Sequence, residues 1–101
     1  MQLGQTIESL RKKRGLNQIE MAKCIGISQT YLSQVENNRK DPNLSVLKKI
    51  ASCLETPLPI IFFLSLEKED VPENKKAAFD VLFPAIDSMV KEFFTRQLAK
   101  P

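Results

Sequence analysis

The sequence predicts an all-α fold, and three of its features indicate this. Apolar residues recur at intervals of three and four along most of the chain, as on the buried face of an amphipathic helix. Runs that alternate β-branched and polar residues, which would indicate strands, are absent from the sequence. Residues that begin or end helices separate the apolar stretches. With 43% hydrophobic residues, the 101-residue chain can build the core of one domain and an appended element.

The first two predicted helices have recognisable ends. An apolar stripe begins at Leu3 and runs into the basic residues 11–14, whose positive charges suit the C-terminal end of a helix. Gly15 can then adopt the backbone conformation that ends the helix. A short second helix follows, because Asn17 is a good N-cap and Glu20 lies three residues later, as in a capping box.

The third predicted helix, at residues 29–37, has an unusual outer face. Gly26 allows a tight turn before it, and Ser28 is a suitable N-cap. A surface helix usually carries charged side chains, whereas this face is polar and uncharged: Gln29, Thr30, Ser33, Gln34 and Asn37. Glutamine and asparagine can form two hydrogen bonds with adenine in the major groove of DNA, and a threonine methyl can contact the thymine methyl. The face therefore predicts contacts with DNA bases.

Three further segments are expected to be helical. Residues 44–54 carry the apolar period of a fourth helix after a polar loop, and residues 60–66 form a short fifth helix after a proline-rich break. The segment 74–101 also has a helical apolar period, which Pro84 interrupts. Pro84 can either kink one helix or begin a second, and we expect two helices that meet there.

The positive charge lies in the N-terminal half. Residues 1–56 have a net charge of +4 and residues 57–101 one of −1, which gives +3 for the whole chain. An excess of this size permits a nucleic-acid partner, although it does not require one.

Several classes of function are disfavoured by what the sequence lacks. It contains two cysteines and no histidine, so Cys and His alone cannot supply four zinc ligands, and no Ser–His or Cys–His nucleophile pair is available. An enzyme, a metal or a cofactor is therefore not expected.

The longest apolar run, at residues 58–64, is too short to span a membrane and no signal peptide is evident. We therefore expect a cytoplasmic protein with no membrane partner and with reduced thiols. Cys24 is expected to be partly exposed and Cys53 to fill the core, and a redox role for Cys24 is the less favoured interpretation.

Residues 3–66 contain a set of spaced features, which are Arg11, Gln18, Ala22, Gly26, Ser28, Glu36, Pro42 and the helix with Leu47, Ile50 and Ala51. By these features the segment resembles the phage repressor/Cro-like (XRE) family of helix-turn-helix transcriptional regulators. The resemblance implies a five-helix, lambda-repressor-like DNA-binding domain over residues 1–66, in which the third helix enters the major groove. Asn38 stands where many relatives have glycine, but asparagine tolerates the left-handed conformation better than most residues, so the loop can be unchanged.

The same resemblance implies a role for individual residues. Glu36 is implied to be structural, and Arg11 is implied to bind a phosphate or to be structural. The residues implied to contact base edges are Gln29, Thr30, Ser33 and Gln34. Those implied to contact the phosphate backbone are Arg11, Gln18, Asn38, Arg39 and Lys40.

The C-terminal segment, after a linker at residues 67–73, has more apolar residues than an unpartnered helix pair needs. They either pack on the preceding domain or form a dimer interface. We favour the dimer, because one helix-turn-helix module reads only a few base pairs and a two-fold pair is the usual way to gain specificity. The expected interface residues are Phe79, Phe83, Ile86, Val90, Phe93 and Phe94.

Together these features predict a transcriptional regulator that binds double-stranded DNA sequence-specifically. We expect a repressor that acts as a homodimer on an inverted-repeat operator. One alternative is the DNA-binding antitoxin of a toxin–antitoxin pair, with the C-terminal helices bound to a protein partner. A second is a protein-interaction module that has lost DNA binding.

Overall fold

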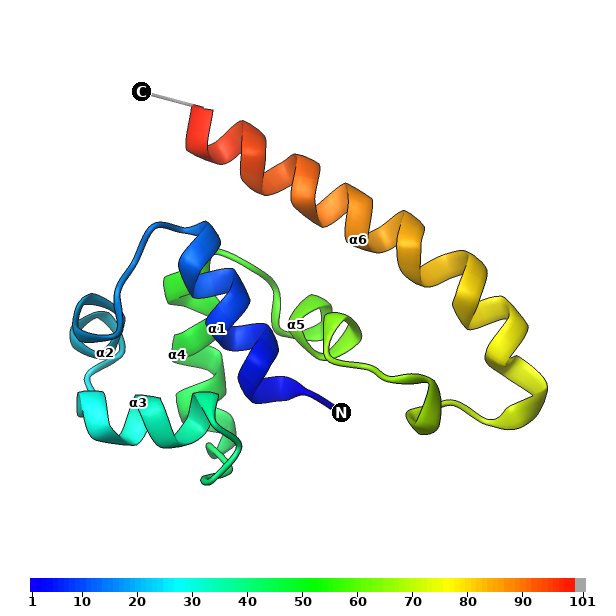
Figure 1. Cartoon of the computed structure of the whole chain (residues 1–101). Coiled ribbons are helices and arrows are strands. Elements are labelled where there is room, and N and C mark those ends of the chain that lie inside the picture. The colour runs from blue at the N-terminus through cyan, green and yellow to red at the C-terminus, as the bar shows by residue number, and fades with distance from the viewer. Residues whose placement is uncertain (100–101) are drawn as a thin grey trace. The chain divides into compact units, whose positions relative to one another are not determined.

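The computed structural model describes the backbone of residues 1–99 and the side chains of residues 1–93, and this part of the chain contains helices and no strand. The predicted all-α fold is therefore confirmed (Figure 1). The chain forms two compact units, which are residues 2–65 and Met1 together with residues 66–101. The helices are α1 (Leu3–Lys13), α2 (Gln18–Ile25), α3 (Gln29–Glu36), α4 (Leu44–Leu54), α5 (Leu58–Leu64) and α6 (Lys76–Ala99), with short 3₁₀ helices η1 (Lys68–Asp70) and η2 (Glu73–Lys75).

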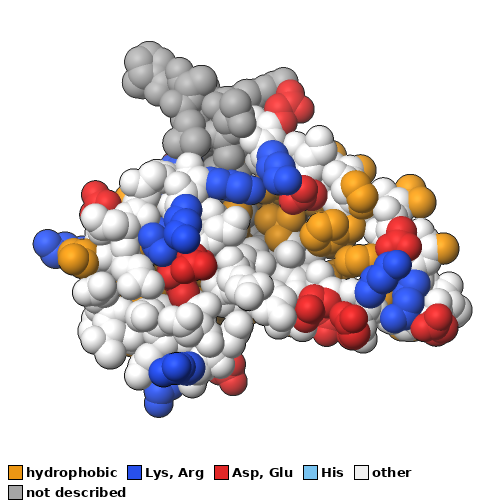
Figure 2. Space-filling model, viewed as in Figure 1, with side chains coloured by type: hydrophobic (Ala, Val, Ile, Leu, Met, Phe, Trp, Pro, Cys, Tyr) orange, Lys and Arg blue, Asp and Glu red, His pale blue; other side chains and the backbone are white. Residues whose placement is uncertain are grey.

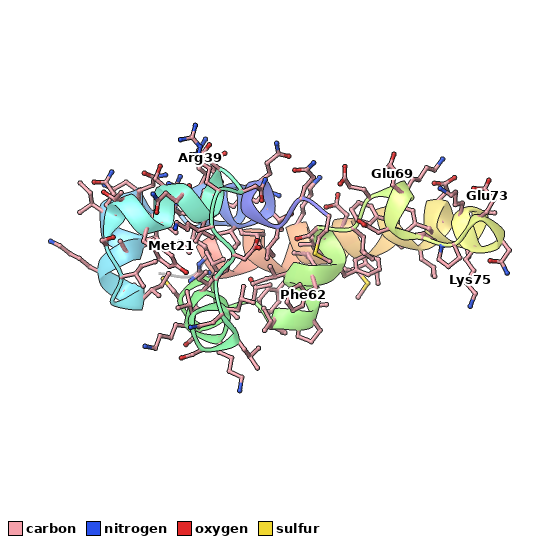
Figure 3. The ribbon with its side chains drawn as sticks, turned by 90° about the horizontal axis from the view of Figure 1, so that it is seen from below. Met21, Arg39, Phe62, Glu69, Glu73 and Lys75 are labelled. Atoms are coloured by element: carbon pink, nitrogen blue, oxygen red, sulfur yellow. The ribbon has the colours of Figure 1, made fainter. Side chains whose placement is uncertain are left out.

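The five helices of residues 2–65 surround one apolar core. α1 packs against α3, α4 and α5, and α2 packs against α3 and α4 (Figure 1). Each helix contributes at least one side chain that is fully buried, and each such side chain stabilises the fold by about 1.5–3 kcal/mol. These residues are Ile7, Met21, Leu32, Ile50, Leu54 and Ile61. Figure 3 shows Met21 on the inner side of α2, which faces this core.

The predicted end of α1, both ends of α2 and the start of α3 are confirmed, whereas α3 ends at Glu36, one residue before its predicted end. Gly15 and Gly26 both have the positive φ, 73° and 84°, that glycine adopts without strain. Asn17 Oδ1 accepts a hydrogen bond of 2.8 Å from Glu20 N, and Glu20 Oε1 accepts one of 2.9 Å from Asn17 N, which completes the capping box. Ser28 Oγ accepts a hydrogen bond of 3.0 Å from Tyr31 N and so caps α3. These caps fix where α3 begins, and therefore which side chains lie in its first turn.

Asn38 has φ 59°, in the left-handed region that the sequence analysis expected asparagine to tolerate at this position. Its Oδ1 accepts a hydrogen bond of 3.1 Å from Gly4 N, which connects the loop after α3 to the first turn of α1.

The close packing at Gly4 was not predicted from the sequence. A Cβ atom at this position would lie 2.5 Å from the carbonyl oxygen of Val35 and 2.6 Å from that of Glu36. The start of α1 and the end of α3 therefore approach so closely that only glycine fits between them.

Replacing Gly4 with alanine is expected to lower the free energy of unfolding by about 1–3 kcal/mol, because the new methyl group would displace the rigid backbone of α3. Urea unfolding of the variant and of the wild-type chain measures this difference. Ser9→Ala is the matched control, since Ser9 is exposed on the same helix. A Gly4→Ala midpoint equal to that of the wild type would contradict the close packing of α1 against α3.

α5 differs from its predicted bounds. It begins at Leu58 instead of residue 60 and ends at Leu64 instead of residue 66. The sequence analysis expected a proline to be tolerated near the start of this helix but began the helix after Pro59, whereas Pro57 is the N-cap and Pro59 lies in the first turn. Proline is tolerated there because the first N–H groups of a helix have no partner within the helix.

α6 is one continuous helix, so the prediction of two helices that meet at Pro84 was wrong. A proline inside a helix removes one backbone hydrogen bond. Pro84 is exposed, so water can solvate the carbonyl group that loses its partner.

The segment before α6, at residues 67–73, was predicted as a linker and contains η1 and the start of η2. Lys68 connects it to α6 through an ion pair of 3.1 Å with Asp80.

Candidate nucleic-acid interface

The outer face of α3 is polar and accessible. Gln29 and Thr30 are exposed in its first turn, and Ser33 and Gln34 are half-buried one turn later. The opposite side of the helix is buried through Leu32 and Val35. Since α3 lies along one edge of the five-helix unit, its polar face is presented outward (Figure 1).

Two glutamines connect α3 to the start of α2. Gln29 Nε2 donates a hydrogen bond of 3.4 Å to Gln18 Oε1, and Gln18 Nε2 donates one of 3.0 Å to Glu36 Oε1. Gln18 is half-buried and is the first residue of α2. The structure therefore brings together Gln18 and Gln29, which the sequence analysis had assigned separately to phosphate and base contacts.

Glu36 is the centre of a buried ionic network. Its carboxylate accepts hydrogen bonds from Arg11 Nε at 2.7 Å and from Arg11 Nη2 at 3.0 Å. Arg11 Nη1 donates to the carbonyl oxygen of Leu16 at 2.8 Å. The Arg11 and Glu36 side chains are only 7% and 1% exposed. The hydrogen bonds that Arg11 donates to the Glu36 carboxylate raise the pKa of Arg11 above its already high usual value, so the guanidinium group stays charged.

This network argues against the phosphate contact expected of Arg11. A phosphate contact needs a guanidinium group at the surface, whereas the Arg11 side chain is buried and each of its three nitrogens donates within the five-helix unit. The structure gives Arg11 a structural position, in which it joins the C-terminal end of α1 to the end of α3. The sequence analysis had considered this alternative but could not identify Glu36 as the partner, because 25 positions separate the two residues.

The loop after α3 carries positive charge next to the polar face. Asn38, Arg39 and Lys40 are all exposed. The backbone N–H groups of Arg39 and Lys40 donate to the carbonyl oxygen of Gln34, at 2.8 and 3.3 Å, which fixes the loop to α3. Figure 2 shows Lys and Arg side chains at the lower end of the five-helix unit, and in Figure 3 the Arg39 side chain extends away from the helices.

Asn37, which the sequence analysis placed on this polar face without giving it an individual base contact, is exposed there. Its Nδ2 donates to Ser33 O at 2.9 Å and to Ser33 Oγ at 3.4 Å. The Ser33 hydroxyl therefore already has one partner within the protein. Gln29 likewise has a partner within the protein, because its amide donates to Gln18.

The residues predicted for the dimer interface lie on α6. Phe79, Phe83, Ile86 and Val90 are half-buried, Phe93 is 49% exposed, and the side chain of Phe94 lies outside the described residues. The rings of Phe79 and Phe83 are 5.2 Å apart between centroids. By helical periodicity Leu82 and Met89 extend the same stripe at its edge, and they are 57% and 68% exposed. Figure 2 shows hydrophobic side chains along α6.

Other kinds of site find little support within the described part of the chain. No three Cys, Asp or Glu side chains there gather in a way that could hold a metal ion. In the same residues, no helix combines the length and apolar character needed to cross a membrane.

Comparisons with known proteins agree with this geometry. The family model described as helix-turn-helix matches residues 7–61. The chain is 42% identical over 59 residues to the ImmF control region 10 kDa protein of Bacillus phage phi105, and 35% identical over 83 residues to the immunity repressor protein of the same phage. It is also 36% identical over 59 residues to antitoxin HipB of Escherichia coli. These matches cover 58%, 80% and 58% of the chain.

The chain spans 66%, 58% and 63% of the lengths of these three relatives, in the same order. The region that the family model matches is more than half of the chain and includes α2, the turn and α3. The chain therefore belongs to the helix-turn-helix family of phage repressor/Cro-like (XRE-type) transcriptional regulators.

Proposed function

We propose that this protein binds double-stranded DNA sequence-specifically and represses transcription as a homodimer on an inverted-repeat operator. The observation that carries the proposal is the uncharged polar face of α3, which is exposed next to the basic loop at residues 38–40. An ordinary surface helix of this length would carry charged pairs instead.

The first turn of α3 supports a base-reading role. In helix-turn-helix proteins the N-terminal residues of the recognition helix contact base edges in the major groove. Gln29 lies there, and its hydrogen bond to Gln18 restricts the orientation of its amide. A restricted glutamine amide can bond N6 and N7 of adenine with less loss of conformational entropy than a freely rotating one.

Contacts with the DNA phosphates would come from the two ends of the helix-turn-helix motif, which are the start of α2 and the loop after α3. Arg39 and Lys40 supply positive charge, and the N-terminal end of α2, at Gln18, supplies unpaired backbone N–H groups. Each phosphate neutralised by a lysine or arginine releases bound counterions, so the affinity for DNA should fall as salt is raised.

The stripe on α6 supports the homodimer. Its exposed edge, at Leu82, Met89 and Phe93, gives a second copy an apolar surface to cover. A two-fold dimer would place the two α3 helices on half-sites about 34 Å apart, or a multiple of this spacing.

Selection of bound duplexes from a random DNA pool tests the proposal most broadly. We expect the enriched sequences to share two half-sites in inverted orientation, separated by about one helical turn. Recovery of unrelated sequences, together with no gel shift at low salt, would exclude sequence-specific binding.

Gln29→Ala is expected to weaken binding to the selected operator by about 1–3 kcal/mol and to relax the base preference at one position of each half-site. Binding to a random duplex should not change. Gel shifts on both duplexes measure the two affinities, and Ser52→Ala is a control on the exposed surface of α4. Equal losses on the operator and on the random duplex would contradict a base contact by Gln29.

Arg39→Ala is expected to weaken binding to all duplexes alike and to reduce the slope of log affinity against log salt by about 1, because one phosphate contact is lost. Lys49→Ala is matched in charge and lies on the exposed side of α4. Fluorescence anisotropy over a range of salt concentrations provides the slopes. A variant that lost affinity only for the operator would show that Arg39 contacts bases and not phosphates.

An antitoxin is a second candidate, favoured by the similarity to antitoxin HipB. In that case α6 would bind a different protein instead of a second copy. A homodimer that forms from the purified chain alone, measured by light scattering, would favour the repressor, whereas a monomer would favour a different partner.

A further inference from the structure

A hydrogen-bond relay runs from the buried ion pair to the outer face of α3. Glu36 Oε1 accepts from Arg11 Nη2 and from Gln18 Nε2, each at 3.0 Å. Gln18 Oε1 in turn accepts from Gln29 Nε2 at 3.4 Å. The Glu36 side chain is only 1% exposed, Gln18 is half-buried and Gln29 is exposed. The relay therefore connects the interior of the five-helix unit to the side chain that is proposed to read bases.

We propose that Glu36 is a positioning residue, which sets the direction of the Gln29 amide through Gln18 and so selects adenine over guanine in each half-site. The inference rests on the proposed DNA-binding function and goes beyond it. It assigns the base that Gln29 reads, and it traces the choice to a carboxylate that is too deeply buried to touch DNA itself.

The donors and acceptors of these side chains fix the direction of both amides. A carboxylate paired with a guanidinium group only accepts hydrogen bonds, so Gln18 must present its NH₂ group to Glu36. The carbonyl oxygen of the same amide then faces Gln29, and it also only accepts. Gln29 must therefore present its own NH₂ group to Gln18. Rotating either amide by 180° would bring two donors or two acceptors together.

The fixed amide leaves Gln29 with one N–H group and its carbonyl oxygen for DNA. In the major groove adenine presents an acceptor, N7, beside a donor, the N6 amino group, whereas guanine presents two acceptors, N7 and O6. One N–H group and one carbonyl oxygen match adenine. Guanine needs two donors, and the second N–H group of Gln29 is already bonded to Gln18. A bidentate contact of this kind discriminates between bases by about 5- to 140-fold.

Glu36→Gln tests the relay with a side chain of the same size. The new carbonyl oxygen must accept from Arg11, so the new NH₂ group faces Gln18, and the amides of Gln18 and Gln29 must then rotate. Gln29 would present both N–H groups to DNA. We expect the ratio of affinities for adenine and guanine at the Gln29 position to fall about tenfold. Competition between two operators that differ at this base pair measures the ratio.

Two further variants separate positioning from a loss of stability. Gln18→Met interrupts the relay but keeps the ion pair of Arg11 and Glu36, so the protein should stay folded while the base ratio falls. The double variant Gln18→Glu, Glu36→Gln keeps the total charge, and its carboxylate at position 18 again accepts from Gln29. The base ratio should therefore recover. A merely structural defect would not be repaired in this way, because position 36 still lacks the carboxylate opposite Arg11.

Nuclear magnetic resonance of the free ¹⁵N-labelled chain tests the relay without DNA. An amide proton of the Gln18 side chain should exchange with water more slowly than those of Gln5, an exposed glutamine on α1. Equal exchange at both glutamines would overturn the relay, whatever the DNA results.

The DNA results distinguish this inference from the proposed function. If the chain bound a selected operator but Glu36→Gln and Gln18→Met left the base ratio unchanged, Glu36 would not position Gln29, and sequence-specific binding would still stand. An operator with no adenine at the base pair that Gln29 reads would have the same meaning. The absence of any sequence preference would overturn both.

Discussion

Replacing Glu36 with alanine is expected to lower the free energy of unfolding by about 3–5 kcal/mol, the largest effect of any single substitution in this account. The variant would leave the Arg11 guanidinium charged and buried, without the two hydrogen bonds of 2.7 and 3.0 Å that now compensate for its desolvation. A loss of this size is a large part of the stability of a small domain, so the variant should be partly unfolded at 37 °C. Urea unfolding followed by circular dichroism measures it.

The double variant Arg11→Met, Glu36→Leu is the control that isolates the unpaired charge. It replaces the ion pair by apolar side chains of similar size, which is often neutral for stability. We therefore expect it to be more stable than Glu36→Ala, although it contains one more substitution. A double variant as unstable as Glu36→Ala would show that the shape of this site matters and its charge balance does not.

Truncation after Asp70 is expected to convert the dimer into a monomer and to weaken operator binding by about 10²- to 10⁴-fold, because each half-site would then be bound independently. The shortened chain keeps residues 2–65, which form a compact unit with their own core. It should therefore fold and retain weak binding to a single half-site. Light scattering gives the oligomeric state, and gel shifts on the half-site and the full operator give the two affinities.

A point substitution in the full-length chain makes the same test without removing a helix. Val90→Glu places a charge in the middle of the α6 stripe, whereas Ser88→Glu places one on an exposed position of the same helix away from the stripe. We expect the first to disrupt the dimer and the second to leave it intact. A truncated chain that is still a dimer would place the interface within residues 1–70.

Local signals predicted much of the DNA-binding unit. The capping box of Asn17 and Glu20, the cap at Ser28 and the left-handed glycines at 15 and 26 depend on residues within a few positions of each other, so the sequence displays them directly. The apolar spacing likewise identified the helices that surround the core, because each stripe must turn inward to be buried.

Contacts between distant segments could not be predicted in the same way. The fit of Gly4 against the end of α3 depends on how two helices cross, and no local pattern reports this. The pairing of Arg11 with Glu36 has the same origin. It arises from packing between helices, which brings together residues that are far apart in the chain.

The misjudged helix ends have a local cause. The fifth helix was expected to begin after Pro59 and two helices were favoured at Pro84, yet Pro59 fits the first turn of α5 and Pro84 is accommodated within α6. A proline excludes the helical hydrogen bond of its own nitrogen, but it does not decide whether the chain continues as a helix on both sides. That depends on whether the apolar stripe continues, and in α6 it does.

Nuclear magnetic resonance of the ¹⁵N-labelled chain with the selected operator tests the central claim most directly. The side-chain amide signals of Gln29 and Gln34 report contacts of the outer face of α3, and the backbone amide of Ser52 reports a surface of α4 outside the proposed interface. We predict that both glutamine signals shift on addition of operator while that of Ser52 does not. If the operator bound and both glutamine signals stayed unchanged, α3 would not be the element that reads the DNA.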